Sequence, residues 1–212
     1  MSAHLQQSLK AEQGAALVLV LCMLIAMLLL GASAAQMALQ GEKAARGERD
    51  RHIAFQAAED ALTDAENDIE GRPGAAGRSA IFAADSAIGF VSACGAGTGN
   101  VYLGLCLLAA PGEAPAWHSV DLSGPESKNS RFIAYGTFTG AAMGTGRGFQ
   151  PFQRSRYIIE LLPYIQPGED AGMSQRYFYR ITAIGFGARD TTQVMLQSYY
   201  RKPGLHAAQV RP

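Results

Sequence analysis

The residues best suited to chemistry in this 212-residue chain are its four histidines, and their spacing forms no recognisable site. They stand at His4, His52, His118 and His206, and no H-x-x-x-H pair, G-x-S-x-G turn or P-loop spacing occurs around them. Glu59 and Glu66 could pair as acids on a helix, but a solvated helix face explains them better. The sequence therefore favours a protein that is not an enzyme and that holds no cofactor or metal.

Two other features also argue against common ligand classes. Residues 95–99 read Gly-Ala-Gly-Thr-Gly, but this stretch neither follows a strong strand nor opens a helix, so we interpret it as a loop. Lys and Arg number 18, as do Asp and Glu, so the formal net charge is zero. A balanced charge excludes a strongly basic nucleic-acid-binding protein, and we expect no nucleic-acid partner.

The three cysteines fall into two environments. Cys94 and Cys106 lie in the polar part of the chain and can form a disulfide if that part is outside the cytoplasm. Such a bridge would close a loop of about 13 residues, worth about 3 kcal/mol in the chain-entropy model. Two unrelated thiols are the alternative, while a metal site lacks the necessary partner ligands. Cys22 lies within an apolar run, where cysteine acts as a small hydrophobic residue.

That apolar run, residues 15–35, is part of a stretch without charge between Glu12 and Glu42. About 20 apolar residues in a helix cross a hydrocarbon core of roughly 30 Å. A secretory signal peptide cut after Ala34 is one alternative, because residues 32–34 read Ala-Ser-Ala, and a buried core helix is another. The run exceeds the roughly 7–15 apolar residues of a signal peptide. We therefore expect a retained transmembrane helix.

The helix is predicted to continue through residues 36–70, since this stretch contains no proline. One narrow apolar stripe recurs there in steps of three and four: Phe55, Ala58, Leu62, Ala65 and Ile69. We expect this stripe to pack on a sheet face that contains residues such as Ile181 or Val194. The segment Gly71–Gly74, which includes a proline, should end a helix of about 55 residues, or roughly 80 Å.

Strand patterns occupy the C-terminal part of the chain. Candidate strands are residues 131–135, 155–162, 177–186 and 191–200, and the last two should form a hairpin around a turn at 187–190. Residues 71–130 are rich in Gly, Ala and Ser and predict irregular structure with a short helix near 80–87. The expected fold class is α+β, with the long helix packed on an antiparallel sheet.

Several of these segments resemble the minor pilins of the PilX family, which belong to type IV pili. The similar segments are Gln13–Leu17, residues 49–62, residues 156–160, residues 179–183 and residues 196–198. The resemblance implies a pilin-like division into a leader at 1–14, a transmembrane helix at 15–35 and its amphipathic extension at 36–70. A globular periplasmic domain at 71–202 and a loose tail at 203–212 complete it.

The resemblance also implies processing and orientation. A prepilin peptidase would cut after Gly14, and Ala15 would become the N-methylated first residue. The leader would then face the cytoplasm, although the basic residues 43–51 would favour the opposite orientation by the positive-inside rule. Most pilins carry Glu at the fifth mature position, where this chain has Leu19. An unpaired amine in a dry core is costly, and a subunit at a filament end could tolerate lacking that acid.

The resemblance thus implies a non-enzymatic minor pilin that helps initiate or cap type IV pili. It would stand in the inner membrane as a single-pass protein with a periplasmic domain, and at the pilus tip after assembly. The implied partners are other minor pilins, the major pilin, the prepilin peptidase, the inner-membrane assembly platform, membrane lipid and a tip adhesin. A pseudopilin-like subunit of a secretion system is one alternative. A periplasmic binding domain released after Ala34 and an anchored enzyme are others.

Overall fold

A computed structural model describes residues 3–71, 77–146, 148–164 and 176–203, with side chains from residue 15 onward. The chain divides into two compact units, residues 1–48 and 49–212, and each is described by itself. Of the predicted loose tail at 203–212, all but Pro203 lies outside the described residues.

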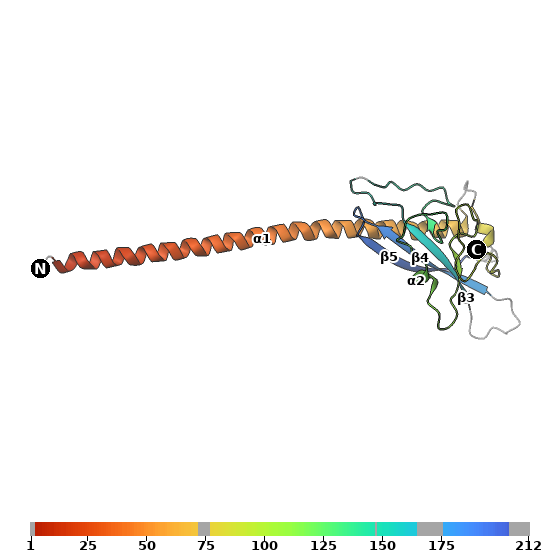
Figure 1. The fold of residues 1–212 in the computed structure, drawn as a ribbon, viewed down its shortest axis with the longest axis horizontal. Helices are drawn as coiled ribbons and strands as arrows, with labels where there is room; N and C mark the ends of the chain where they lie inside the picture. Colours follow the sequence, from red (N-terminus) through yellow and green to blue (C-terminus); the bar gives the residue numbers. More distant parts are fainter. Residues whose placement is uncertain (1–2, 72–76, 147, 165–175, 204–212) are drawn as a thin grey trace, which may run out of the picture. The chain divides into compact units, whose positions relative to one another are not determined.

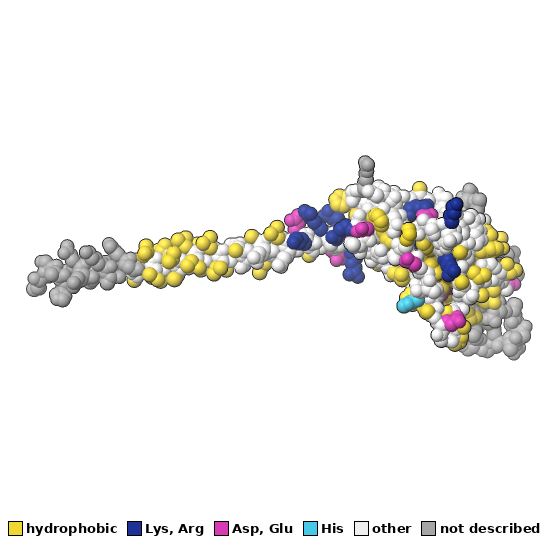
Figure 2. Space-filling view, viewed as in Figure 1, with side chains coloured by type: hydrophobic (Ala, Val, Ile, Leu, Met, Phe, Trp, Pro, Cys, Tyr) yellow, Lys and Arg dark blue, Asp and Glu magenta, His cyan; other side chains and the backbone are white. Residues whose placement is uncertain are grey.

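One helix, α1 (Ala3–Glu70), contributes to both units (Figure 1). It begins well before residue 15, where the prediction placed its start. It ends as predicted, because Gly71 adopts a positive φ of 85° and donates its N–H to the Asn67 carbonyl at 2.9 Å. By length and composition the helix contains a stretch from Ala15 onward that could cross a membrane. On the face shown in Figure 2, hydrophobic side chains cover this stretch until the charged residues begin.

The second unit contains a five-stranded sheet within the described residues. Its strands are β1 (Leu105–Leu107), β2 (Ile133–Ala134), β3 (Arg156–Tyr164), β4 (Arg176–Phe186) and β5 (Gln193–Tyr200). The order is β1-β3-β4-β5, and β2 also pairs with β3. The predicted hairpin is present as β4 and β5, in a register that places Ile181 opposite Ser198.

The prediction of a purely antiparallel sheet is wrong at one position, because β1 runs parallel to β3. Three residues within a glycine-rich stretch are too short to show strand periodicity. In the same stretch the predicted helix near 80–87 is only a 3₁₀ turn at Ser79–Ile81, and the short helix α2 (Ala116–Ser119) was not predicted. Non-local pairing, rather than local pattern, determines these elements.

The part of α1 in the second unit packs closely on the sheet. Its buried face consists mainly of small side chains: Ala54, Ala57, Ala58, Ala61, Ala65 and Ile69. Small residues let the helix backbone approach β4, and a Cβ at Gly185 would lie only 2.1 Å from the Ala54 carbonyl oxygen. Ala61, Ala65 and Ile69 share one core cluster with Ile181, so the predicted packing on the Ile181 face is confirmed.

The predicted stripe is wrong at Phe55, whose side chain is 41% exposed. The close approach of helix and sheet selects small residues, and it shifts the centre of the buried face toward Ala54, Ala57 and Ala61. Leu62 lies at the margin of this face, partly buried against the core cluster. The sequence pattern followed the larger side chains and therefore pointed about one residue away from the true contact.

Substitutions along α1 should follow this gradient of burial. We expect Ile69→Ala to lower the free energy of unfolding by about 2–5 kcal/mol, because Ile69 is fully buried. Leu62→Ala should cost about 1–2 kcal/mol, and the exposed Phe55→Ala should stay within about 0.5 kcal/mol. Denaturant unfolding of the full-length protein in detergent measures all three. Equal losses at the three positions would contradict this description of the buried face.

Candidate functional site

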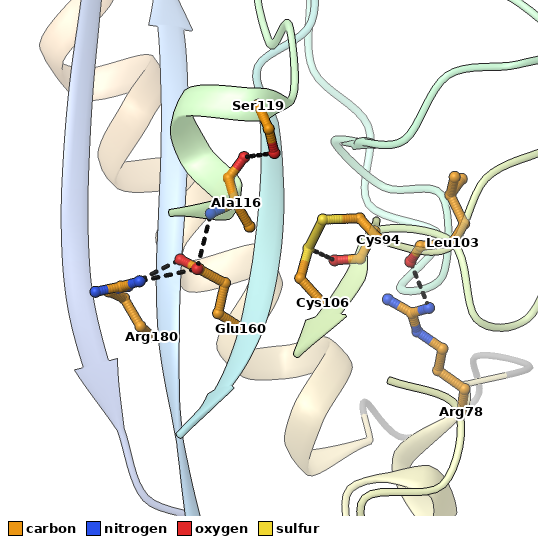
Figure 3. The surroundings of a disulfide bond; sticks show 9 residues. Arg78, Cys94, Leu103, Cys106, Ala116, Ser119, Glu160 and Arg180 are labelled. Atoms are coloured by element: carbon orange, nitrogen blue, oxygen red, sulfur yellow. Dashed lines mark hydrogen bonds and ion pairs between the residues drawn. A yellow bond between two sulfur atoms is a disulfide. The ribbon is translucent and has the colours of Figure 1, made fainter. Parts of the chain in front are cut away.

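A disulfide joins Cys94 to Cys106, as predicted, and ties an irregular segment to the sheet (Figure 3). Cys106 is the central residue of β1 and pairs with Glu160 of β3. Cys94 belongs to the second core cluster, which lies on the sheet face opposite α1 and includes Ile158, Ile184 and Phe186. The bridge therefore fixes the glycine-rich loop at residues 95–105 against the sheet. Cys22, in α1, is an exposed free thiol.

This bridge should be detectable and stabilising. In protein isolated without reductant, we expect Cys94 and Cys106 to resist alkylation and Cys22 to react. Cys94→Ser should lower the free energy of unfolding by about 3 kcal/mol, because the unfolded chain regains the entropy of an open loop. Cys22→Ser is the matched control and should leave the melting curve unchanged. Alkylation of all three thiols in the native protein would refute the bridge.

A buried carboxylate holds α2 beside the disulfide (Figure 3). Glu160 of β3 is fully buried and accepts hydrogen bonds from Arg180 Nε and Nη2, each at 2.8 Å. The backbone N–H of Ala116, the first residue of α2, also reaches Glu160 at 3.3 Å. The hydrogen bond to Glu160 raises the pKa of Arg180, so the pair stays charged. Every polar contact described here is structural.

Two acids of α1 reach loops on the other side of the helix. Asp64 accepts hydrogen bonds from the Gly136 N–H at 2.8 Å and from the Thr139 hydroxyl. Asp68 forms a buried ion pair with Arg78, with Nη2 to Oδ2 at 2.8 Å. The sequence placed both acids outside the buried stripe, yet both are almost completely buried. No local signal distinguishes them from solvated acids, because their partners are distant in sequence.

A third acid of α1 holds the turn between β4 and β5. Asp50 accepts hydrogen bonds from the Ala188 N–H at 2.6 Å, the Arg189 side chain at 2.9 Å and the Thr192 hydroxyl. Burial raises the pKa of Asp50, but these hydrogen bonds outweigh burial and lower that pKa below its usual value. We call Asp50, Asp64 and Asp68 the acid clamps of α1.

The C-terminal end of α1 is also tied to the segment that follows β5. Lys202 Nζ donates to the carbonyls of Ile69 at 2.8 Å and Ser79 at 2.9 Å. A lysine at this place satisfies a carbonyl at the helix end and complements the helix dipole. The Tyr200 hydroxyl donates to Glu70 at 2.7 Å, and burial together with Glu70 raises the pKa of Tyr200 to about 12. The helix is thus held at both ends of its contact with the sheet.

The remaining predicted site residues lie on the apolar half of α1. Gly14 and Ala15 are consecutive residues within the helix. Leu19 is 64% exposed, as are its large apolar neighbours. Among the described residues no group of three or more His, Cys, Asp or Glu side chains could hold a metal ion. The arrangement is that of an apolar anchor and a rigidly tied domain, which suits assembly with other chains.

Comparison with known families decides what kind of protein this is. Residues 93–202 match the family described as type IV pilus assembly protein PilX, C-terminal part, and residues 13–63 match the PilX N-terminal family. The chain belongs to the PilX family. No curated protein and no solved structure matches this PilX-family chain significantly.

Membership makes this PilX-family chain a component of type IV pilus assembly, a structural rather than enzymatic kind of protein. The C-terminal match begins just before Cys94 and ends at Lys202, so it includes the disulfide and every sheet strand. The N-terminal match includes Gly14, Leu19 and the first acid clamp, Asp50. Other components of the pilus machinery are therefore its partners.

Proposed function

We propose that this chain is a minor pilin, a non-enzymatic subunit that helps initiate or cap the assembly of type IV pili. The observation that carries the proposal is the PilX N-terminal match over an apolar helix with leucine at position 19. In the proposed processing, the leader is removed after Gly14 and Ala15 becomes the methylated N-terminus. Leu19 is then the fifth residue of the mature chain.

Leu19 favours a place at the filament end over one in the filament body. A subunit in the body must present a carboxylate to a neighbour's amine in a medium of low dielectric constant, where an unmatched charge is expensive. Leucine cannot accept that charge. At a filament end one such apposition is absent, so an apolar side chain carries no penalty there and packs against lipid or neighbouring helices.

The proposed mechanism has three stages. The Ala15–Ala35 helix first stands in the inner membrane, with residues 71–202 in the periplasm. It then packs laterally with other minor pilins, and the assembly platform extracts this complex into a growing helical bundle of major pilin. Exposed apolar residues on the helix are the surface that such a bundle would bury.

Deletion of the gene tests this function. We expect far fewer pili per cell in electron micrographs, with filaments of nearly normal length, and restoration by a wild-type copy. Immunogold labelling of the restored strain should mark filament ends. Even labelling along the shaft at the abundance of the major pilin would overturn the proposal, as would full piliation in the deletion strain.

A further inference from the structure

Strand β5 forms an edge of the sheet that carries none of the usual protection against pairing (Figure 1). Its eight residues contain no charge and no proline. Natural edge strands are normally protected by lysine, proline, a bulge or a covering segment. The paired register of β4 and β5 is regular from Tyr179 opposite Tyr200 to Phe186 opposite Gln193. An unprotected edge of this length is a template for a further strand.

The hydrogen-bond pattern shows which backbone groups face outward. Gly187 donates its N–H to the Thr192 carbonyl at 2.8 Å, which makes these two residues a hydrogen-bonded pair. Such pairs alternate along an antiparallel ladder. Even-numbered residues of β5 therefore turn their N–H and C=O toward β4, and odd-numbered residues turn theirs outward. The outward residues are Gln193, Met195, Gln197 and Tyr199, and within the described chain no backbone hydrogen bond pairs them.

The side chains along this edge are also incompletely covered. Met195 is 45% exposed and Tyr199 is 64% exposed on the face opposite α1. On the α1 face, Val194 and Leu196 are only half-buried, and Leu62 of the helix is partly buried at the same margin. The Ser198 hydroxyl is buried and has no hydrogen-bond partner in the described structure. A strand added beside β5 would cover both faces and could offer that hydroxyl a partner.

A second copy of this chain does not fit the edge in the usual antiparallel way. Two identical β5 strands paired antiparallel are related by a two-fold axis perpendicular to the sheet. Because α1 packs on that sheet, the axis reverses the direction of α1 in one copy. The Arg49 ends, from which the apolar segments continue, would then point in opposite directions. Two chains anchored in one membrane cannot meet this requirement.

We propose that β5 accepts an extended, uncharged segment of another pilus subunit as a sixth strand. The absence of charge from Gln193 to Tyr200 selects against a charged segment, since an unpaired charge beside this strand would lose hydration without a counter-ion. Main-chain hydrogen bonds from the four outward residues provide binding, and alternate side chains over Leu62 and Met195 provide specificity. This inference rests on the proposed function only in taking the donor from the pilus.

A photo-crosslinking experiment in living cells tests it. Tyr199 of the full-length chain is replaced by photoreactive p-benzoylphenylalanine, an aromatic side chain of similar shape, and adducts are identified by mass spectrometry. We expect an adduct with a different pilus subunit, attached within one extended segment. Gln197→Pro removes an outward N–H and should reduce this adduct at least tenfold. Gln197→Ala, the matched control, loses the same side-chain bond to Thr182 but keeps the N–H, and should retain the adduct.

Further measurements keep the result decisive. The same probe at Ile88, an exposed residue outside the sheet, should not give this adduct. If Gln197→Pro fails to accumulate, amide hydrogen exchange at the outward residues should be at least tenfold slower in the assembled complex than in detergent-solubilised protein. An adduct only with a second copy, equal adducts in both Gln197 variants, or unprotected outward amides would overturn the proposal. A deletion strain without pili combined with any of these would reject the strand alone and leave the minor-pilin function standing.

Discussion

Gly14→Glu should leave the full-length precursor in the membrane and prevent its assembly into pili. The proposed cut follows Gly14, where a protease must approach the backbone closely and a side chain obstructs it. Intact mass measurement of the purified membrane protein separates the precursor from a mature chain that begins at N-methyl-Ala15. We expect complete loss of the mature form, the largest functional effect of any single change in this chain.

The competing interpretation predicts a different result with a different variant. Ala34→Leu spoils the Ala-Ser-Ala pattern at residues 32–34 but keeps the segment apolar. Under the pilin interpretation this variant matures normally. A mature wild-type chain that begins at Ala35, or normal processing of Gly14→Glu, would exclude prepilin processing.

Arg78→Ala should cause the largest loss of stability in the globular unit, about 3–5 kcal/mol, because it leaves Asp68 as an unpaired buried charge. Burial raises the pKa of Asp68 and the Arg78 pairing opposes that rise, so removal of Arg78 should raise this pKa further. Arg78 also donates to the Val101 and Leu103 carbonyls at 2.6 and 2.8 Å, which would lose their donor. Its guanidinium lies 3.8 Å from the centre of the Phe138 ring.

The chain offers a matched control in an exposed ion pair. Arg154 contacts Glu126 at 3.1 Å, with both side chains about half exposed, and Arg154→Ala should cost less than about 1 kcal/mol. Denaturant unfolding of both variants makes the comparison. The double variant Asp68→Ala with Arg78→Ala should lose less than the sum of the single variants, since neither leaves a lone buried charge. Similar losses for Arg78→Ala and Arg154→Ala would contradict this account of the buried pair.

The local sequence predicted the elements whose pattern is long and regular. The helix through residue 70, the hairpin of β4 and β5, and the Cys94–Cys106 bridge all follow from composition, spacing and turn residues. Long periodic segments bury or expose one face by themselves, so their pattern reports the structure. The α1 contact was predicted only approximately, since Ala54, Ala57 and Ala61 carry it while Phe55 stands outside.

The parts that could not be predicted depend on partners that are distant in the sequence. Strand β1 exists because Leu105–Leu107 pairs with β3, about 50 residues away by the printed register, and not because of its own pattern. Asp64 and Asp68 are buried because Thr139 and Arg78 reach them. A solvated acid and a clamping acid have the same sequence signature, so one sequence alone could not separate them.

The acid clamps also determine how the domain would respond to mechanical force. A pilus under tension pulls on α1 along its axis. Asp50, Asp64, Asp68 and the Lys202 contact attach that helix to four segments spread over its length: the β4–β5 turn, the Gly136–Thr139 loop, Arg78 and the end of β5. Attachments distributed in this way bear an axial load together, in shear, whereas attachments at one end would break one after another. The helix could therefore transmit traction to the whole sheet before any single contact failed.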